Sequence, residues 1–156
     1  MQPHIRAYKQ TDKDACLQAF ISNVPQFFTE AEIAYFSNFL DYFQQIIANN
    51  KTYYYVVIIN DTLVGCGGFG DKDGTDTITL AWGLIHNKYH KKGLGELLLQ
   101  HRLNEIKHIY PTKPIYIDTT QHTFGFFEKF GFTTTKITHD YYEKGMHRYD
   151  MVYHQQ

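Results

Sequence analysis

The chain has 156 residues, of which 43% are hydrophobic and 20% are charged, and its formal net charge is −1. This composition is that of a globular chain of one-domain size, so we expect a single domain over residues 1–156. The near-neutral charge excludes a general nucleic-acid binder, and no apolar run approaches a membrane span or a signal peptide. Cys16 and Cys66 form neither a disulfide framework nor a CxxC motif. We therefore expect a cytoplasmic protein with no nucleic-acid or membrane partner.

The first third of the chain predicts a short strand and two helices. A weak alternation marks the strand, and Thr11 is a candidate N-cap of the first helix, with Asp14 three residues later. Apolar residues at helical spacing mark the second helix, which begins at Thr29 and ends near Asn49 and Asn50. The predicted strand covers residues 5–8, and the predicted helices cover residues 11–23 and 29–50.

The middle of the chain is rich in β-formers and contains two turn signals. Asn60 and Asp61 separate two runs of β-branched and aromatic residues, which predicts a hairpin. Residues 71–75 contain Asp, Lys and Gly and predict a second turn before a third strand. The three predicted strands cover residues 53–59, 62–69 and 77–85.

The C-terminal half alternates helices and strands. Pro111 and Pro114 break the chain after a long helix, and Gly131 is a candidate C-cap of a shorter one. The predicted helices cover residues 94–109 and 123–130, and the predicted strands cover residues 115–118, 132–138 and 148–153. The order is therefore β-α-α-β-β-β-α-β-α-β-β, an α/β (α+β) fold with a mixed sheet. Its β-α-β step implies two parallel neighbours joined by a right-handed crossover.

The segment HKKGLGE, residues 90–96, joins the third β-type run to the long helix. The first N–H groups of a helix have no internal partner, and the helix dipole adds positive potential there. Gly93 and Gly95 leave the backbone bare, and Lys91 and Lys92 add charge, so the segment is built like a phosphate site. The alternative is that the glycines only shape the turn. Both the GK[ST] ending of a P-loop and the third glycine of a dinucleotide fingerprint are absent.

Three stretches, in the same order along the chain, resemble the GNAT superfamily of N-acetyltransferases. HKKGLG, residues 90–95, resembles motif A, with His90 where Gln or Arg is usual. Residues 84–89 resemble the strand end before that motif, with Asn87 where proline is common. FFEKFGF, residues 126–132, resembles the closing FYEKxGF signature. The resemblance covers nearly the whole chain and implies a GNAT-like fold, in which two central parallel strands splay apart where a thioester binds.

The resemblance also implies an acetyl-CoA site. Backbone N–H groups of the glycine turn would hold the pyrophosphate, and the preceding strand would pair with the pantetheine arm. Gly83 is notable in itself, because glycine inside a strand indicates a kink, a bulge or the close approach of a ligand. The implied acetyl-CoA residues are Gly83, Leu84, Ile85, Lys91, Lys92, Gly93, Leu94, Gly95 and Glu96.

The implied reaction is attack of a neutral amine on a thioester, which a base assists. Asp118, at the end of a predicted strand, is our first choice for that base. The alternative is that Asp118 caps the helix predicted to begin near Gln121. We expect a backbone N–H near Ile85 to stabilise the oxyanion.

The identity of the acid is open. Phe127 stands where many family members carry a tyrosine that protonates the leaving thiolate. Tyr141, Tyr142 or His122 would then substitute, or no acid acts, since a thiol with a pKa of about 8.5 leaves readily as a thiolate. The catalytic candidates are Asp118, His122 and Tyr142.

The acceptor site is the least legible part of the sequence. In this family the segment between the first strand and the hairpin usually walls that site, and here the segment holds aromatic residues, whose alternative role is core packing. No acidic run lies there to attract a polycationic amine. His86 and His90 have no evident third ligand, so we expect no metal. The substrate-binding candidates are Phe28, Trp82 and His147.

The leading hypothesis is an acetyl-CoA-dependent N-acetyltransferase that acts on the primary amine of a small molecule or amino-acid-like acceptor by direct attack in a ternary complex. One alternative is a GNAT-fold module that binds acyl-CoA without catalysing transfer, and another is an unrelated binder of a phosphate ligand. Fold similarity alone does not fix the substrate. The aromatic residues either fill the core or form an association surface, which leaves a homodimer open.

Overall fold

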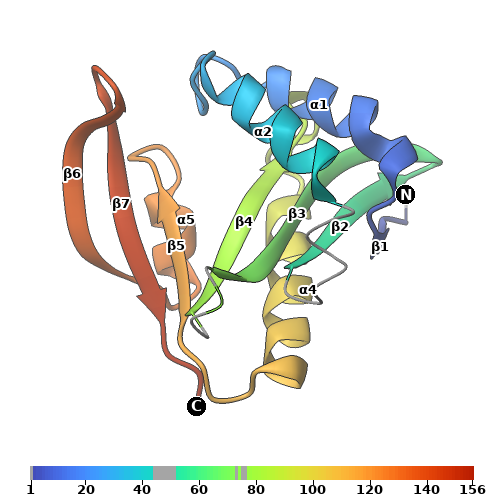
Figure 1. The fold of residues 1–156 in the computed structure, drawn as a ribbon. Coiled ribbons are helices and arrows are strands. Elements are labelled where there is room, and N and C mark those ends of the chain that lie inside the picture. Colours follow the sequence, from blue (N-terminus) through green and yellow to red (C-terminus); the bar gives the residue numbers. More distant parts are fainter. Residues whose placement is uncertain (1, 44–51, 73, 75–76) are drawn as a thin grey trace.

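The computed structural model describes residues 2–43, 52–72, 74 and 77–156. It has a mixed α/β fold around one seven-stranded sheet in the order β1-β2-β3-β4-β5-β7-β6 (Figure 1). All neighbouring strands are antiparallel except β4 and β5. The strands are β1 His4–Ala7, β2 Thr52–Ile59, β3 Thr62–Lys72, β4 Thr77–Ile85, β5 Ile115–Thr119, β6 Thr133–Glu143 and β7 Met146–Tyr153. The helices are α1 Lys13–Ile21, α2 Glu32–Asp41, α4 Leu94–Ile109 and α5 Phe124–Lys129, with short 3-10 helices η1 Gln10–Asp12 and η2 Asn87–Tyr89.

Helices cover both faces of the sheet (Figure 1). On one face, α1 and α2 bury Phe20 and Phe36 against the sheet. On the other face, α4 and α5 bury Leu99 and Phe127 in a separate cluster. The expected element order and mixed sheet are thereby confirmed, because the helical and β-type apolar patterns of the sequence each find a buried face.

β4 changes faces at a bulge. The register between β3 and β4 shifts there, and Trp82 has a φ of 43°. Before the bulge Leu80 packs with the α4 and α5 cluster, whereas after it Leu84 packs with α1 and α2. The Tyr54 hydroxyl donates to the Trp82 carbonyl at 2.7 Å and fixes the bulge. A single irregular residue therefore redirects the second half of the strand.

β4 and β5 pair only at one end. Ile78 lies opposite Ile115 and Thr79 opposite Tyr116, and the ladder stops there although β4 continues to Ile85. Beyond these pairs the two strands diverge toward their C-terminal ends, as Figure 1 shows. This is the expected splayed parallel pair, and it leaves backbone groups of both strands without a neighbouring strand.

α1 begins later than residue 11 because a short 3-10 helix precedes it. Thr11 lies inside η1 and is not the N-cap of α1. The Asp12 carboxylate organises this turn, since it accepts the Lys9 N–H at 2.8 Å and two bonds from Arg6 at 2.8 and 2.9 Å. The predicted N-cap was therefore wrong by one residue, because the ion pair with β1 selects Asp12.

α2 begins at Glu32, with Ala31 as its N-cap, rather than at Thr29, although Thr29 and Glu32 exchange hydrogen bonds in the manner of a capping box. Glu32 Oε1 accepts the Thr29 N–H at 2.9 Å, and Thr29 Oγ1 accepts the Glu32 N–H at 3.3 Å. The predicted end of this helix, near residues 49 and 50, lies outside the described residues, as does part of the predicted turn at 71–75.

The last hairpin is longer than expected. β6 runs to Glu143 and β7 begins at Met146, whereas the sequence predicted strands over 132–138 and 148–153. Gly145, with a φ of 86°, closes the tight turn between them. β6 is exposed or half-buried along its length, so its residues are mostly polar. The sequence therefore lacks the alternation of apolar and polar residues that would have predicted the full strand.

Candidate active site

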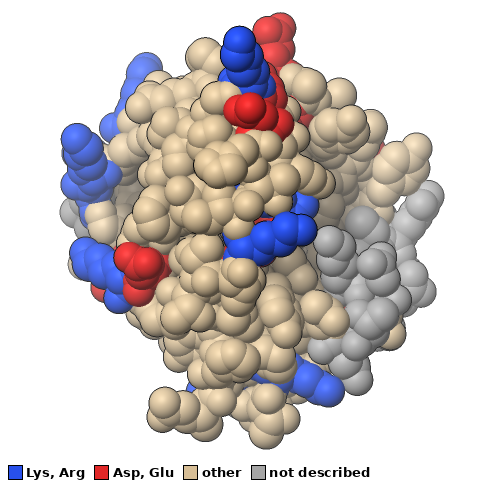
Figure 2. Space-filling model, turned by 90° about the vertical axis from the view of Figure 1, so that its left-hand side faces the viewer, with Lys and Arg blue, Asp and Glu red and all other residues tan. Residues whose placement is uncertain are grey.

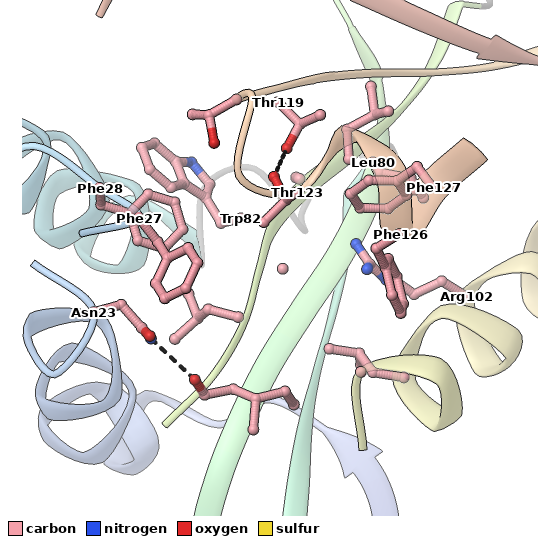
Figure 3. A pocket seen from close by; sticks show the side chains of 18 of the residues that line it. Asn23, Phe27, Phe28, Leu80, Trp82, Arg102, Thr119, Thr123, Phe126 and Phe127 are labelled. Atoms are coloured by element: carbon pink, nitrogen blue, oxygen red, sulfur yellow. Dashed lines mark hydrogen bonds between the residues drawn. The ribbon is translucent and has the colours of Figure 1, made fainter. Parts of the chain in front are cut away.

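A cavity of about 900 Å³ opens where β4 and β5 diverge. It extends from Gly93 at the start of α4, past both strands, to residues beside α2 on the other face of the sheet. Figure 3 shows Phe27 and Phe28 on one side of this space and Phe126 and Phe127 on the other. A channel with apolar walls therefore passes through the gap in the sheet.

The glycine turn before α4 opens into one end of the cavity. Gly93 is the N-cap of α4 and has a φ of 80°, a left-handed conformation that favours glycine. The Leu97 N–H is the first to bond back, to the Gly93 carbonyl at 3.1 Å. Among the described residues, none accepts a hydrogen bond from the N–H groups of residues 93–96. The turn therefore offers unpaired donors at the positive end of a helix dipole, as an anion site requires.

The Ile85 carbonyl on β4 is held by two side chains that the sequence did not reveal as site residues in this role. Asn23 Nδ2 donates to it at 2.9 Å and His90 Nε2 at 2.8 Å. The next residue, His86, donates its N–H to the Val64 carbonyl of β3 at 2.8 Å. In a strand, the N–H and C=O groups of one residue point to one side and those of the next residue point to the other. Since the His86 N–H points to β3, the N–H and C=O of Ile85 point away from β3, toward the gap. With its carbonyl occupied, Ile85 offers the cavity its N–H.

Gly83 lies against a buried arginine from α4. A Cβ built at Gly83 would lie 2.7 Å from Arg102 Nη2 and 2.9 Å from Nη1. Arg102 is only 3% exposed, and Nη1 donates to the Gly68 carbonyl at 3.3 Å. Burial lowers the pKa of Arg102 to about 10, so the guanidinium stays charged at neutral pH. The bulge is present beside Gly83, and the group that lies against the bare backbone is a guanidinium of the chain itself.

Asp118 and Tyr142 meet in the cavity. The Tyr142 hydroxyl donates to Asp118 Oδ2 at 2.7 Å, and both residues line the cavity. Burial, and next the negative charge of Asp118, raise the pKa of Tyr142, so its phenol stays protonated. Asp118 does not cap the following helix, because α5 begins at Phe124 with Thr123 as its N-cap.

Glu32 brings a second carboxylate to the same cavity. Burial raises its pKa, and the charges of Asp118 and Glu143 raise it further, while hydrogen bonds from Thr29 act in the opposite direction. The expectation of no acidic run in this segment holds for the sequence, but it missed Glu32. The sequence placed Glu32 in the opening turn of the second helix, and no local pattern shows that its carboxylate also lines the cavity.

The remaining candidates fall inside and outside the cavity. Phe28, Trp82 and His122 line it, and His122 is exposed and meets Phe27 edge-on at 6.0 Å between ring centroids. His147 does not line it: its Nδ1 accepts the Asp140 N–H at 2.9 Å in the β6–β7 hairpin. His147 therefore lies outside the cavity wall, although its N–H donates to Gln121 Oε1 at 2.9 Å, and its contact with the acceptor stays a prediction.

The other implied acetyl-CoA residues lie around the glycine turn. Ile85, Lys91, Leu94, Gly95 and Glu96 line the cavity together with Gly83, Leu84 and Gly93, whereas Lys92 does not. No group of three or more His, Cys, Asp or Glu side chains in the described part of the chain could hold a metal ion. Within the same residues, no helix is long and apolar enough to cross a membrane.

The comparison with protein-family models gives the family. The model of the acetyltransferase (GNAT) domain matches residues 24–154, most of the chain. The chain belongs to the GNAT acetyltransferase family. It is accordingly an acetyltransferase, and the sequence resemblance is confirmed. A search of curated proteins finds no match.

Solved GNAT structures share this fold from end to end. The N-acetyltransferase from Staphylococcus aureus Mu50 has a TM-score of 0.80 at 16% identity, with 100% of both chains covered. The ribosomal-protein-S18-alanine N-acetyltransferase from Escherichia coli has a TM-score of 0.74 at 15% identity, covering 98% of this chain and 94% of that one. PaiA N-acetyltransferase from Thermoplasma acidophilum, in complex with coenzyme A, has a TM-score of 0.74 at 15% identity, covering 99% of each chain. At these identities the likeness shows the fold alone.

Proposed function

We propose that this GNAT protein transfers an acetyl group from acetyl-CoA to the primary amine of a small molecule or amino-acid-like acceptor, by direct attack in a ternary complex. The observation that carries the proposal is one cavity with two chemically different ends. One end presents the unpaired N–H groups of residues 93–96, and the other presents Asp118 and Tyr142. A thioester between them would meet an amine at the gap of the sheet.

The residues at the start of α4 fit the donor. Unpaired backbone donors, a positive dipole end and Lys91 suit the pyrophosphate of CoA. When bound, acetyl-CoA supplies the acyl group in activated form, as a thioester. The Ile85 N–H points into the gap, where a backbone donor suits the oxygen that gains charge during attack. The complex of the Thermoplasma PaiA protein with coenzyme A supports a CoA site in this fold.

Asp118 has the position of a general base. Its carboxylate lies on β5 at the gap, and the hydrogen bond from Tyr142 fixes its orientation. The pKa of Tyr142 is raised, so this phenol is a poor proton donor to the leaving thiolate. We assign Asp118 the task of accepting the proton of the amine, and Tyr142 the task of positioning Asp118. His122 stays the remaining candidate for the acid.

The acceptor end favours a cation. Glu32 and Asp118 both face it, and the fixed negative charges attract an ammonium group before it loses its proton. Phe27 and Phe28 add an apolar wall beside them, as a small organic amine requires.

The test has two stages. Titration with CoA and acetyl-CoA, with ADP as the comparison, should raise the melting temperature, since ligand at about a hundred times its Kd adds about 2.7 kcal/mol of stability. Release of CoA thiol is then followed across a panel of small amines, amino acids and peptides; Cys16 and Cys66 are fully buried and should contribute little background. Acceptor-dependent release supports the enzyme. Tight binding with no release across the panel would instead indicate a non-catalytic acyl-CoA module.

A further inference from the structure

Arg102 is a buried cation of the cavity wall that the proposed reaction does not use. It lies on the buried stripe of α4, at helical spacing with Leu94, Leu98 and Ile106. Its side chain is 3% exposed, yet no carboxylate of the described residues pairs with it. Nε has no partner, and the contact of Nη1 with the Gly68 carbonyl is long, at 3.3 Å.

A buried cation with unused donors is costly unless a ligand pairs with it. Figure 3 shows the Arg102 guanidinium directed toward the centre of the cavity, close to Phe126 and Phe127. Its immediate neighbour on β4 is Gly83, whose missing side chain leaves room for Nη2. The walls around it are apolar, which strengthens any charge pair formed there. The cavity wall therefore holds a guanidinium whose unused donors a small anion would satisfy.

The location of Arg102 separates this guanidinium from the other two parts of the cavity. Arg102 follows Leu94 by about 12 Å along the helix axis, so a pyrophosphate at the start of α4 does not reach it. It comes from the α4 face of the sheet, whereas Glu32 and the α2 wall lie on the opposite face. Because Arg102 lies against Gly83, a thioester bound along β4 at Gly83 would bring its acyl group next to the guanidinium.

We propose that this site also accepts short dicarboxylic acyl groups from CoA, with the terminal carboxylate of the acyl chain paired to the Arg102 guanidinium. The inference rests on the proposed function. A planar carboxylate accepts two parallel hydrogen bonds from a guanidinium. The terminal methyl group of an ordinary acyl chain accepts none and leaves these donors unpaired. In the transfer step the amine nitrogen forms a bond to the thioester carbon, the C–S bond breaks, CoA leaves as its thiolate, and the amine proton passes to the base. The product is an amide with a free carboxylate.

The test compares two acyl chains of four carbons that differ in the terminal carboxylate. Calorimetric titration of the wild-type protein with freshly prepared succinyl-CoA and with butyryl-CoA needs no acceptor. We expect succinyl-CoA to bind at least tenfold more tightly, about 1.4 kcal/mol. Arg102→Met should abolish that preference and leave the Kd of CoA itself within about twofold. Lys129→Met, which removes a cation elsewhere in the cavity wall, should keep the preference.

The results distinguish a carboxylate-binding Arg102 from one that only supports the backbone. Equal affinities, or tighter binding of butyryl-CoA, in the wild-type protein would show that Arg102 only supports the Gly68 carbonyl, and this result requires no variant. A preference that survives in Arg102→Met would remove Arg102 from the assignment. If Arg102→Met does not fold, Arg102→Lys, which keeps the charge without the fork, should lose most of the preference. Failure of CoA itself to bind would overturn the proposed function together with this inference, whereas acetyl transfer without the preference would overturn the inference alone.

Discussion

At the scale of single residues, the site depends on which carboxylates are charged and how they are held. Asp118 receives the Tyr142 hydroxyl at 2.7 Å, while Glu32 is held by Thr29 and has a raised pKa. The two carboxylates therefore differ although they share a cavity. Asp118 is oriented by a phenol that stays protonated. Burial disfavours the ionised form of Glu32.

Asp118→Asn should lower acceptor-dependent CoA release at neutral pH by about a hundredfold or more, which is the usual contribution of a general base. The asparagine oxygen still accepts the Tyr142 hydroxyl, so the Kd of CoA should stay within about twofold. Tyr142→Phe is the matched variant: it keeps the carboxylate and removes only its positioning bond, for a loss of about tenfold. Wild-type turnover in Asp118→Asn would show that Asp118 is a bystander.

Glu32→Gln should raise the melting temperature at neutral pH. The pKa of Glu32 is raised in the folded state, so the folded state binds the proton more tightly than the unfolded state does. Ionised Glu32 therefore lowers stability as pH rises from its ordinary pKa of 4.5 through the folded value. Gln keeps the oxygen that accepts the Thr29 N–H. The gain in melting temperature should disappear below pH 4, where Glu32 is neutral in both the folded and the unfolded state. A gain of equal size at all pH values would contradict this account.

At the scale of elements, regular patterns were predictable and tertiary contacts were not. β4 at Thr77–Ile85 and α4 at Leu94–Ile109 begin and end where the sequence predicted, because their apolar periods match a buried face. The geometry of the glycine turn was also predictable, since Gly93 stands at the start of a helix and glycine favours the left-handed conformation found there.

The parts that were missed depend on residues far apart in sequence. Asn23 reaches the Ile85 carbonyl across 62 positions, and no local pattern indicates such a bond. Arg102 left a faint signal, as a charge on the apolar stripe of α4, but only the bulge at Trp82 and the bare backbone of Gly83 show what it meets. His147 lies outside the cavity wall because the β6–β7 hairpin is longer than the sequence pattern predicted, and hairpin length is not visible in that pattern.

Gly93→Val should weaken CoA binding before it affects anything else. A β-branched residue at a φ of 80° is strained by about 1–2 kcal/mol, and relief of that strain would turn the N–H groups of residues 93–96 away from the pyrophosphate. We expect a loss of CoA affinity of about tenfold or more. Gly93→Asn is the control, since asparagine tolerates the left-handed region, and it should bind CoA nearly as well as glycine does. Equal losses in both variants would mean that side-chain bulk, not backbone conformation, matters.

At the scale of the whole molecule, the sheet consists of two arms joined at one end. β1–β4 form one arm and β5–β7 the other, and in the part of the chain that the structure describes two residue pairs, Ile78 with Ile115 and Thr79 with Tyr116, link them. On the face turned toward the viewer in Figure 2, Lys, Arg, Asp and Glu lie scattered among uncharged residues rather than in one patch of a single sign. The charges on this face therefore mark no binding site, and we expect ligands to bind in the cavity at the gap between the arms.

CoA should tie the two arms together. Hydrogen exchange of backbone amides should slow on both sides of the gap, at the end of β4 near Ile85 and at the end of β5 near Thr119, as well as at residues 93–96. ADP, which carries a pyrophosphate without the pantetheine arm, should slow exchange only at the glycine turn. Protection confined to that turn with CoA would mean that the arm does not enter the gap.

The divergence of β4 and β5 has a consequence for the protein without its ligand. Beyond Thr79 and Tyr116 the two strands are edges, although they lie in the middle of the sheet. An edge pairs with any extended chain that reaches it, and β proteins normally blunt theirs with charge, proline or a short length. Here Asn23 and His90 already bond the Ile85 carbonyl on that edge, and a pantetheine arm in the gap would cover more of it. Protein saturated with CoA should therefore stay in solution on storage. Protein without CoA exposes these edges to extended segments of other copies and should aggregate faster.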